Sequence, residues 1–220
     1  MLRGAAVVVC VLALAAAGCG GDDESNSGAA GTTAAGGKCE TVDAPAARDD
    51  GGATQPTERL DPEKTWTLTF ETSCGSFVVT LDPAGAPAST ASLVSLAKAG
   101  FYDDTIFHRI VPGFVIQGGD PTQSGSGGPG YSTVDAPPAD TTYPKGTVAM
   151  AKYSEEPAGT AGSQFFVVTE DNVDLAPDYA VVGRVTDGLD VVQLIGTLGD
   201  PNTEQPLQPV VIESVTAKSA

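Results

Sequence analysis

The sequence predicts a mainly β fold in which short antiparallel strands close, or nearly close, into a barrel. Three observations support this class. Most apolar stretches alternate with polar residues at the period of two that is typical of strands, and only two stretches have the helical period. The 27 glycines and 16 prolines fall largely in the joints between these stretches and in the N-terminal region. Many short strands, few helices and Gly/Pro-rich joints are typical of an antiparallel barrel.

The first two strands form a predicted hairpin. Large apolar residues alternate with threonines over residues 66–70, and the alternation resumes over residues 77–81. Ser73-Cys74-Gly75 lies between the two stretches and supplies a turn.

Two segments have the helical period. Pro87 opens the first segment, an apolar stripe follows over residues 93–97, and Gly100 ends it, so we expect a helix of about three turns. The second predicted helix covers Leu189 to Ile195, between two glycines. The remaining predicted strands are 113–118, 146–151, 164–169, 180–185 and 209–216.

Residues 1–18 have the pattern of an export signal. Met1-Leu2-Arg3 supplies a basic start, and the uncharged run from Gly4 to Ala17 is too short to span a bilayer comfortably. The sequence Ala16-Ala17-Gly18-Cys19 resembles the lipobox of bacterial lipoproteins, in which the cysteine is acylated and becomes the mature N-terminus. An ordinary secretory signal cut near Ala17 is the alternative. Either signal takes the protein out of the cytoplasm.

The mature chain is strongly acidic. Removing residues 1–18 takes Arg3 from the 11 basic residues and leaves all 28 acidic ones, a formal charge of −18 (10 − 28). Such a surface repels nucleic acid, which argues against a nucleic-acid partner. Residues 19–64 are rich in Gly, Ala, Asp, Thr and Pro without apolar periodicity, which predicts a flexible acidic tether. Residues 65–220 then make one domain.

Two cysteines remain in the mature protein besides the expected lipid site. Cys10 leaves with the signal and Cys19 would carry the lipid, so Cys39 and Cys74 are left. An even pair in an exported chain is typical of a disulfide, and this one would pin the end of the tether to the domain. A redox or metal site is the alternative, but the chain has no Cys-x-x-Cys and only one histidine.

The stretch from Ile106 to Asp120 is the most informative about function. Arg109, Phe114 and Gln117 lie inside an apolar run, where burying an unpaired charge is costly. A pocket with one apolar side and directed hydrogen-bond donors on the other would use all three residues. Alternatively, Arg109 is a structural charge paired with an acid, and Phe114 is an ordinary core aromatic.

Three blocks follow one another in order: Phe-Tyr-Asp-Asp-Thr-Ile-Phe-His-Arg (101–109), Pro-Gly-Phe-Val-Ile-Gln-Gly-Gly-Asp-Pro (112–121) and Gly-Ser-Gln-Phe-Phe-Val (162–167). Together they resemble the signature of the cyclophilin-type peptidyl-prolyl isomerases, and the resemblance extends over roughly 65–217. It implies an eight-stranded closed antiparallel β-barrel capped by two α-helices. This agrees with the barrel that the periodicity predicts.

The resemblance also implies an enzyme, a peptidyl-prolyl cis-trans isomerase that needs no cofactor and no metal. Its catalytic residues would be Arg109, Phe114 and Gln117. Arg109 would donate to the prolyl nitrogen, and Gln117 would hold both Arg109 and the substrate backbone. The ring of proline would sit among apolar side chains, and the strand edge at Ala151-Lys152 would bind the peptide main chain. The substrate-binding residues implied in this way are His108, Val115, Ala151, Lys152, Gln164, Phe166, Leu175 and Tyr179.

Two of these residues have simpler alternative roles. Phe166, like Phe114, has the burial preference of an ordinary core aromatic. His108 is the only histidine, and acid/base catalysis or metal binding is its alternative role. Isomerisation needs no proton transfer and the chain offers no partner ligands, so we interpret His108 as part of the pocket wall.

The chain departs from the family pattern at the rim of the expected pocket. Many members carry Trp-Leu followed shortly by His, where this chain has Asp174-Leu175 and then Tyr179. The tryptophan is associated with cyclosporin binding in the family, so we expect weak cyclosporin binding. Tyr179 preserves an aromatic wall. Tyr153 stands where a small residue is usual, and three extra residues lengthen the loop before Gly162.

Two functions from different classes follow. The first is an active isomerase for exported proteins, anchored to the outer face of the bacterial cell membrane by lipidated Cys19. The second is a non-catalytic surface module that binds proline-containing segments. Both have proline-containing polypeptides as partners, and a monomer is expected. Retention of Arg109 together with Phe114 and Gln117 favours the enzyme, because a binding module does not need the donor to nitrogen.

Overall fold

The computed structural model describes residues 38–171 and 173–220. The predicted signal, Cys19 and the first part of the predicted tether lie outside the described residues. Strands and helices alternate irregularly along the described chain. They are β1 (Trp66–Thr72), β2 (Gly75–Leu81), α1 (Pro87–Lys98), β3 (Thr105–Ile106), β4 (Arg109–Val111), β5 (Val115–Gly118), β6 (Thr133–Val134), β7 (Thr147–Met150), β8 (Thr160–Ala161), β9 (Phe165–Val168), β10 (Val181–Asp187), α2 (Leu189–Gly196) and β11 (Val211–Ser219).

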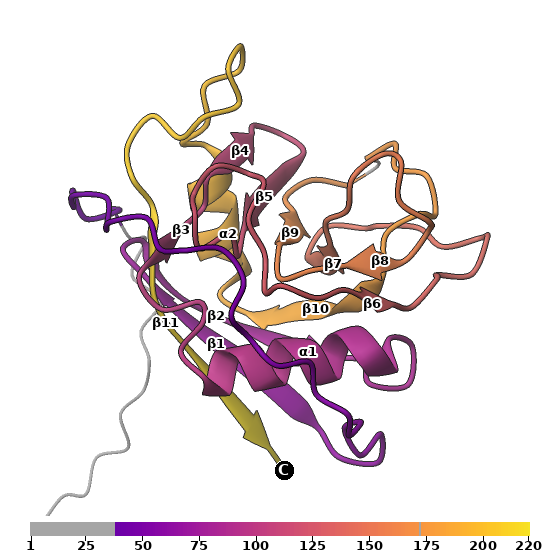
Figure 1. Ribbon diagram of the computed structural model, residues 1–220. Coiled ribbons are helices and arrows are strands. Elements are labelled where there is room, and N and C mark those ends of the chain that lie inside the picture. The colour runs from indigo at the N-terminus through magenta and orange to yellow at the C-terminus, as the bar shows by residue number, and fades with distance from the viewer. Residues whose placement is uncertain (1–37, 172) are drawn as a thin grey trace, which may run out of the picture. The chain divides into compact units, whose positions relative to one another are not determined.

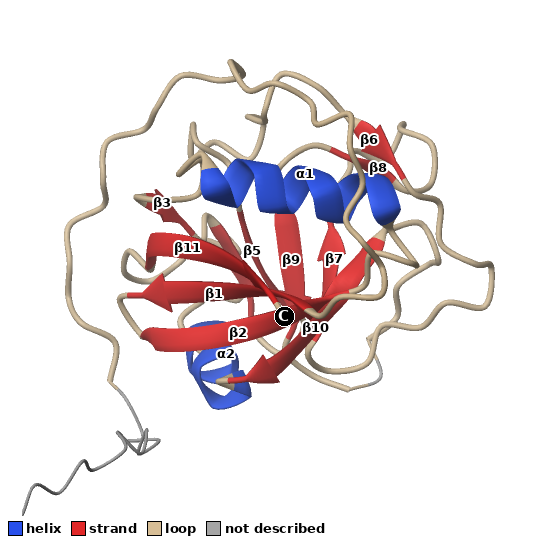
Figure 2. Cartoon of the chain, turned by 90° about the horizontal axis from the view of Figure 1, so that it is seen from below, coloured by secondary structure: helices blue, strands red, loops and turns tan. Residues whose placement is uncertain are grey.

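One antiparallel sheet of nine strands makes up most of the domain. Its order is β3-β11-β1-β2-β10-β7-β9-β5-β4, and β6 pairs separately with β8. Figure 1 shows the strands curling around a common interior, and Figure 2 shows α1 and α2 on opposite sides of the curled sheet. The mainly β class with two helices is therefore confirmed.

The closed eight-stranded barrel is not confirmed in detail. The sheet has nine strands, and among the described residues β3 and β4 form its two ends without pairing to each other. Only Phe107 and His108 separate these two strands along the chain, so the chain itself passes from one edge of the sheet to the other. β3 pairs over two residues and β4 over three. Strands this short show no alternation, and the periodicity therefore did not predict them.

The helix at Pro87 begins where the sequence predicts and is capped by a distant residue. Its first turn carries no acidic side chain. Instead, Asp135 accepts hydrogen bonds from the backbone N–H groups of Ala88 (3.2 Å) and Ser89 (2.6 Å). This carboxylate satisfies two of the unpaired donors at the N-terminus and complements the helix dipole. In residues 38–171 and 173–220 no helix has the length and apolarity required to cross a membrane.

Side chains on β5, β7 and β9 separate into two apolar clusters, because successive residues of a strand point to opposite faces. Phe165 belongs to the main core inside the sheet, where Phe70 and Phe77 stack with ring centroids 4.7 Å apart. Phe166, the next residue, belongs to a second cluster. The second cluster has five buried members: Val115, Tyr143, Ala149, Phe166 and Val168.

The segment 38–64, which the sequence assigns to the tether, lies against the domain. We call it the strap. It has no helix or strand, yet its apolar residues Ala53 and Leu60 pack against the main core, and it forms several hydrogen bonds to the loops that it crosses. In Figure 1 its first part is the indigo segment. A polar, Gly/Pro-rich composition predicted this absence of regular structure, but it did not reveal the backbone contacts.

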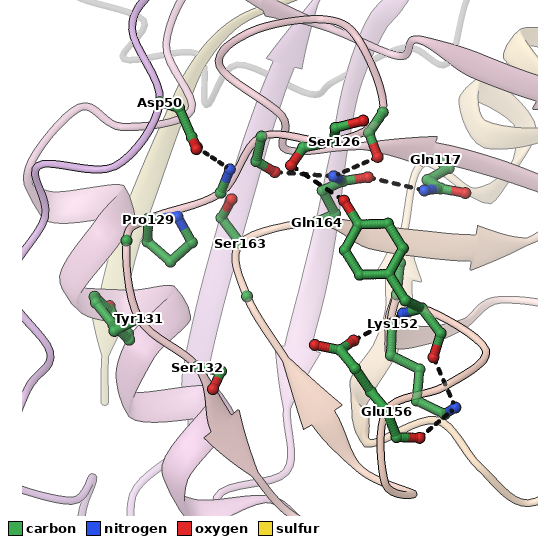
Figure 3. A pocket seen from close by; sticks show the side chains of 17 residues that line it. Asp50, Gln117, Ser126, Pro129, Tyr131, Ser132, Lys152, Glu156, Ser163 and Gln164 are labelled. Carbon is green, nitrogen blue, oxygen red and sulfur yellow. Dashed lines mark hydrogen bonds between the residues drawn. The ribbon is translucent and has the colours of Figure 1, made fainter.

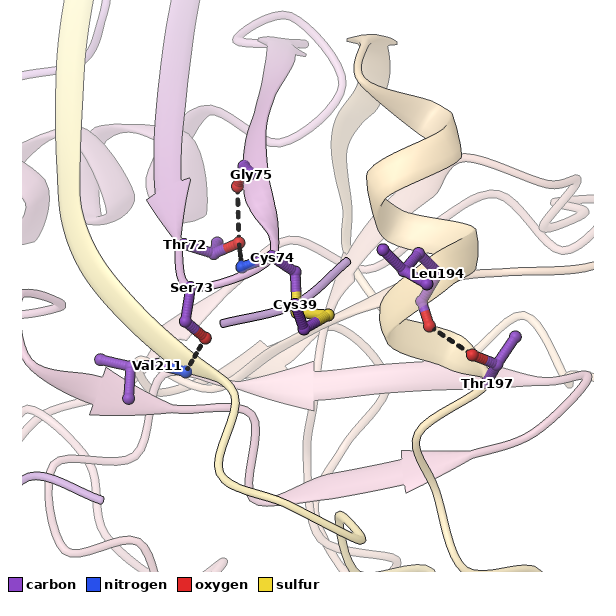
Figure 4. The surroundings of a disulfide bond; sticks show 8 residues. All are labelled: Cys39, Thr72, Ser73, Cys74, Gly75, Leu194, Thr197 and Val211. Atoms are coloured by element: carbon purple, nitrogen blue, oxygen red, sulfur yellow. Dashed lines mark hydrogen bonds between the residues drawn. A yellow bond between two sulfur atoms is a disulfide. The ribbon is translucent and has the colours of Figure 1, made fainter. Parts of the chain in front are cut away.

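The predicted disulfide between Cys39 and Cys74 is present and fixes the beginning of the strap (Figure 4). Cys74 is buried in the turn between β1 and β2. Next to it, the Glu40 N–H donates to the carbonyl of Ser73 (2.7 Å), and the Ser73 hydroxyl accepts from the Val211 N–H (3.1 Å). The bridge therefore joins the strap to a point where three segments of the chain meet.

Candidate active site

A chain of hydrogen bonds begins at Arg109 and crosses three segments. The β4–β5 hairpin places Arg109 directly opposite Gln117, and the guanidinium Nη1 donates to Gln117 Oε1 (3.3 Å). Gln117 Nε2 donates to Gln164 Oε1 (3.0 Å). Gln164 Nε2 in turn donates to the carbonyls of Gly125 (3.0 Å) and Gly127 (2.9 Å). Three of the predicted site residues thus form one network.

Glu204, which the sequence did not suggest, holds Arg109 from the other side. Arg109 Nε donates to Glu204 Oε2 at 2.7 Å, with the two side chains 36% and 44% exposed. The Glu204 carbonyl also accepts from the Ile110 N–H (2.8 Å). An acid therefore pairs with Arg109, as the structural interpretation expects, and the pairing fixes a guanidinium that still has donors to offer.

The second apolar cluster forms a concentrated aromatic surface beside this network. Phe114, Leu175 and Tyr179 are partly buried and pack against it. The ring of Tyr179 meets that of Phe166 edge-on at 5.3 Å. Val115 and Phe166 themselves are 2% and 5% exposed, so they form the base of this surface, and the partly buried residues form its accessible part.

Tyr143 positions Tyr179 and is a second residue that the sequence did not suggest. Its hydroxyl donates to the Tyr179 carbonyl and accepts from the Tyr179 N–H, both at 3.0 Å. Burial raises the pKa of Tyr143, so the hydroxyl stays protonated and can make both bonds. The Lys152 ammonium lies 5.8 Å from the centre of the Tyr179 ring, a cation–π contact at the rim.

A cavity of about 360 Å³ adjoins the network (Figure 3). The predicted residues Gln117, Ala151, Lys152 and Gln164 line it, together with the Gly-rich loop of residues 125–130. The described lining of this cavity does not include Arg109, Phe114 or Phe166. The structure thus separates the predicted site into a polar cavity, which Gln117 and Gln164 line, and an apolar surface formed by the second cluster.

Ala151 and Lys152, which the sequence assigns to a strand edge, lie beyond the end of β7. β7 ends at Met150 and pairs on both sides, with β10 and with β9, so it is an interior strand. Ala151 follows the end of β7, and its N–H already donates to the Gln164 carbonyl (2.9 Å). Ala151 and Lys152 therefore lie in the wall of the cavity.

Asp120 is a buried residue that holds the start of the Gly-rich loop by hydrogen bonds. It is fully buried and accepts from the N–H groups of Thr122 (2.7 Å) and Gly125 (2.6 Å). Burial alone would raise the pKa of Asp120, but hydrogen bonds from Thr122, Gly127 and Gly125 outweigh it and leave the pKa lowered. A Cβ atom at Gly127 would lie 2.2 Å from Asp120 Oδ1, so the loop approaches the carboxylate as closely as only glycine allows.

His108 lies behind the Gly-rich loop and not in the cavity lining. In the described residues neither ring nitrogen has a hydrogen-bond partner, and a Cβ atom at Gly125 would lie 3.8 Å from the ring. Burial lowers the pKa of His108, against a smaller raising effect of Asp120, and Arg109 lowers it further. The imidazole is therefore neutral near pH 7. It does not line this cavity, where the sequence predicts it as part of the wall.

We expect His108 to make the fold sensitive to mild acid. Its folded pKa lies below the ordinary value of 6.5, so below that pH the unfolded chain binds more protons and the free energy of unfolding falls as the pH is lowered. Urea unfolding at pH 7 and pH 5 should show a smaller loss for His108→Gln than for the parent. Equal losses would contradict this role. Asp120 does not interfere, because it titrates below 3.8.

Glu204 gives a second prediction. Its removal leaves Arg109 bound to Gln117 alone, so the guanidinium should sample orientations that do not face a substrate, and turnover should fall about tenfold in Glu204→Ala. The exposed Glu213→Ala is a matched control that removes the same charge elsewhere. Peptide affinity, measured by NMR titration, should change little in both. Unchanged turnover in Glu204→Ala would show that Gln117 suffices to hold Arg109.

Comparison with known proteins identifies the family. The family described as cyclophilin type peptidyl-prolyl cis-trans isomerase/CLD matches residues 67–217. The probable peptidyl-prolyl cis-trans isomerase A of Mycobacterium leprae is 36% identical over 168 residues, which cover 68% of this chain and 91% of that protein. The peptidyl-prolyl cis-trans isomerase B of Streptomyces anulatus is 36% identical over 171 residues, covering 69% and 95%.

Solved structures agree with this assignment. A cyclophilin type peptidyl-prolyl cis-trans isomerase from Cryptosporidium parvum superposes with a TM-score of 0.64 at 26% identity, covering 71% of this chain and 99% of that one. A crystal structure of the same protein in the presence of the dipeptide Ala-Pro gives 0.63 at 28% identity, covering 70% and 99%. The chain therefore belongs to the family of cyclophilin-type peptidyl-prolyl cis-trans isomerases, enzymes of class EC 5.2.1.8.

Proposed function

We propose that this chain accelerates rotation about X-Pro bonds in exported polypeptides, with Arg109 as the donor to the prolyl nitrogen. The observation that carries the proposal is the position of Arg109. Glu204 and Gln117 hold its guanidinium from two sides, and an apolar aromatic surface that includes Phe114 lies beside the same hairpin. Its Nη2 donates to no protein group in the part of the chain that the structure describes.

The chemistry requires only binding and a well-placed donor. Rotation about a peptide bond has a barrier of about 18–20 kcal/mol, because the nitrogen lone pair is delocalised into the carbonyl. A hydrogen bond to the nitrogen localises the lone pair in the twisted state, which it stabilises more than either planar ground state. Phe114, Leu175 and Tyr179 would receive the proline ring, and Gln117 would orient the guanidinium. No proton is transferred and no covalent intermediate forms.

Exchange NMR with the full chain and a short proline peptide tests the activity. Isomerase activity would raise the cis–trans exchange rate far above that of the free peptide, where exchange takes tens of seconds or longer. Binding without faster exchange would overturn the enzyme proposal and favour the surface module. The exposed Asp174 occupies the place of the family tryptophan, so we expect weak cyclosporin binding in the same titrations.

We further propose that the protein is exported and anchored by lipid at Cys19. The support is the signal-like run of residues 1–18, the sequence before Cys19, and the disulfide, which is typical of oxidising compartments. Fatty-acid labelling of the protein in cells should be lost in Cys19→Ala. Labelling that survives this substitution would exclude lipidation at Cys19.

A further inference from the structure

The strap lies along the loop of residues 121–132, part of which forms one wall of the cavity. At one end the Arg48 N–H donates to the Pro121 carbonyl (2.8 Å). In the middle the N–H groups of Gly51 and Ala53 donate to the carbonyls of Gly128 (2.9 Å) and Pro129 (3.1 Å). The strap therefore binds the outer side of this loop, while Gln164 binds its inner side at Gly125 and Gly127.

The two backbones approach each other closely at Gly130. Gly130 has a φ of +88°, and a Cβ atom on it would lie 3.2 Å from the Cα of Gly51 and 3.3 Å from the nitrogen of Gly52. Gly51 also has a positive φ, +76°. Positive φ and close backbone approach both favour glycine. Glycine therefore stands on both sides of this contact, at Gly51 in the strap and at Gly130 in the loop.

Asp50 is the residue of the strap that lines the cavity. Its side chain is among those that line the cavity, and its Oδ1 accepts from the Gly128 N–H at 2.6 Å. Figure 3 shows Asp50 and Glu156 on opposite sides of the cavity. The one lysine of the lining, Lys152, donates from Nζ to the carbonyls of Tyr153 (3.1 Å) and Glu156 (3.0 Å). The cavity therefore contains two carboxylates, Asp50 and Glu156, and one ammonium group, that of Lys152. The ammonium already donates hydrogen bonds to two carbonyls.

Both carboxylates come from parts of the chain outside the common family pattern. Asp50 precedes the family match, which begins at residue 67, and Glu156 lies in the lengthened loop before Gly162. Glu156 Oε2 accepts from the Tyr153 N–H (2.8 Å). A carboxylate has about four acceptor positions on two oxygens, so Asp50 and Glu156 both retain capacity for a further donor.

We propose that the strap is part of the substrate site, and that Asp50 with Glu156 makes the cavity select a lysine or arginine side chain from a residue close to the proline. The inference rests on the proposed isomerase function, because the cavity shares Gln117 and Gln164 with the proposed catalytic network. The guanidinium or ammonium of the substrate would lie between the two carboxylates, and its aliphatic stem would cross the Gly-rich wall. Asp50 also holds that wall in place through Gly128.

The test is the affinity of the full chain for peptides that are identical except for one residue near proline, which is lysine, alanine or glutamate. Dissociation constants from NMR titration should favour the lysine peptide over the glutamate peptide. Asp50 is exposed, so Asp50→Asn should reduce this preference about two- to fivefold, as expected for an exposed charge pair. Asp50→Asn keeps the side-chain oxygen that accepts from Gly128. The double variant Asp50→Asn/Glu156→Gln should lose the preference.

Asp49→Asn is the matched control, because this exposed neighbour has the same charge and does not line the cavity. It should keep the preference for lysine. No preference in the parent, or an equal loss in Asp49→Asn, would overturn the proposal. Because the readout is binding, a chain that binds selectively without turnover would contradict the isomerase function and leave the selective cavity supported. Turnover without selectivity would contradict the cavity proposal alone.

Discussion

Replacing Arg109 by alanine is expected to lower kcat/KM for X-Pro isomerisation by about 10²- to 10³-fold, the cost typical of removing one donor that acts in the transition state. Peptide affinity should change by less than about fivefold. The difference arises because the guanidinium would bind the prolyl nitrogen strongly only when the bond is twisted, whereas the planar ground states rely on the aromatic surface. Exchange NMR measures the rate and the affinity in one sample.

Two further variants test the planar shape of the Arg109 side chain and the contact that Gln117 makes with it. Arg109→Lys keeps the positive charge but loses the planar fork that lets Glu204 and Gln117 bind two different edges, so we expect intermediate activity. Gln117→Ala should lower activity less than Arg109→Ala, since Glu204 still holds the guanidinium. Turnover at the parent rate in Arg109→Ala would exclude the lone-pair mechanism, whatever the other variants do.

Removing the disulfide is expected to lower the free energy of unfolding by about 4 kcal/mol, the chain-entropy value for a loop of this length. The bridge joins residues 35 positions apart in sequence. Without it the unfolded chain gains the freedom of the whole strap and of β1, while the folded chain loses the anchor beside Ser73. Urea unfolding of Cys39→Ala, followed by tryptophan fluorescence, measures the difference.

A chemical control distinguishes the bridge from the side chain. The parent protein in a strong reductant should unfold at the same urea concentration as Cys39→Ala, and the reductant should not affect the variant. Cys74 is 4% exposed and packs in the core as a free thiol without difficulty. A parent protein that is equally stable with and without reductant would contradict the prediction.

Periodicity found the long elements and missed the short ones. β1, β2, α1 and α2 begin and end within about two residues of their predicted bounds, because alternation or an apolar stripe extends over a whole turn or several strand residues. β3, β4, β6 and β8 have two or three residues each, and a period cannot be recognised over that length. The strand number and the closure of the sheet depend on these pieces.

The residues of the candidate site could be predicted where they belong to one sequence motif. Arg109 and Gln117 are eight residues apart on one hairpin, so a single stretch of sequence contains both. Glu204 is 95 residues from Arg109, and Asp50 is 78 residues from Gly128. Both are ordinary acids in polar loops, like most of the other 26 acidic residues (28 − 2). Only folding brings them to the site, so no pattern in the sequence distinguishes them.

The pairing of β1 with β11 has a consequence for the order of events during synthesis. Trp66 lies opposite Ser219 and Phe70 opposite Val215 in an antiparallel ladder. About 150 residues must therefore follow β1 out of the ribosome before β1 acquires this neighbour. Contacts between such distant segments slow folding. Until β11 arrives, one edge of β1 stays exposed to association.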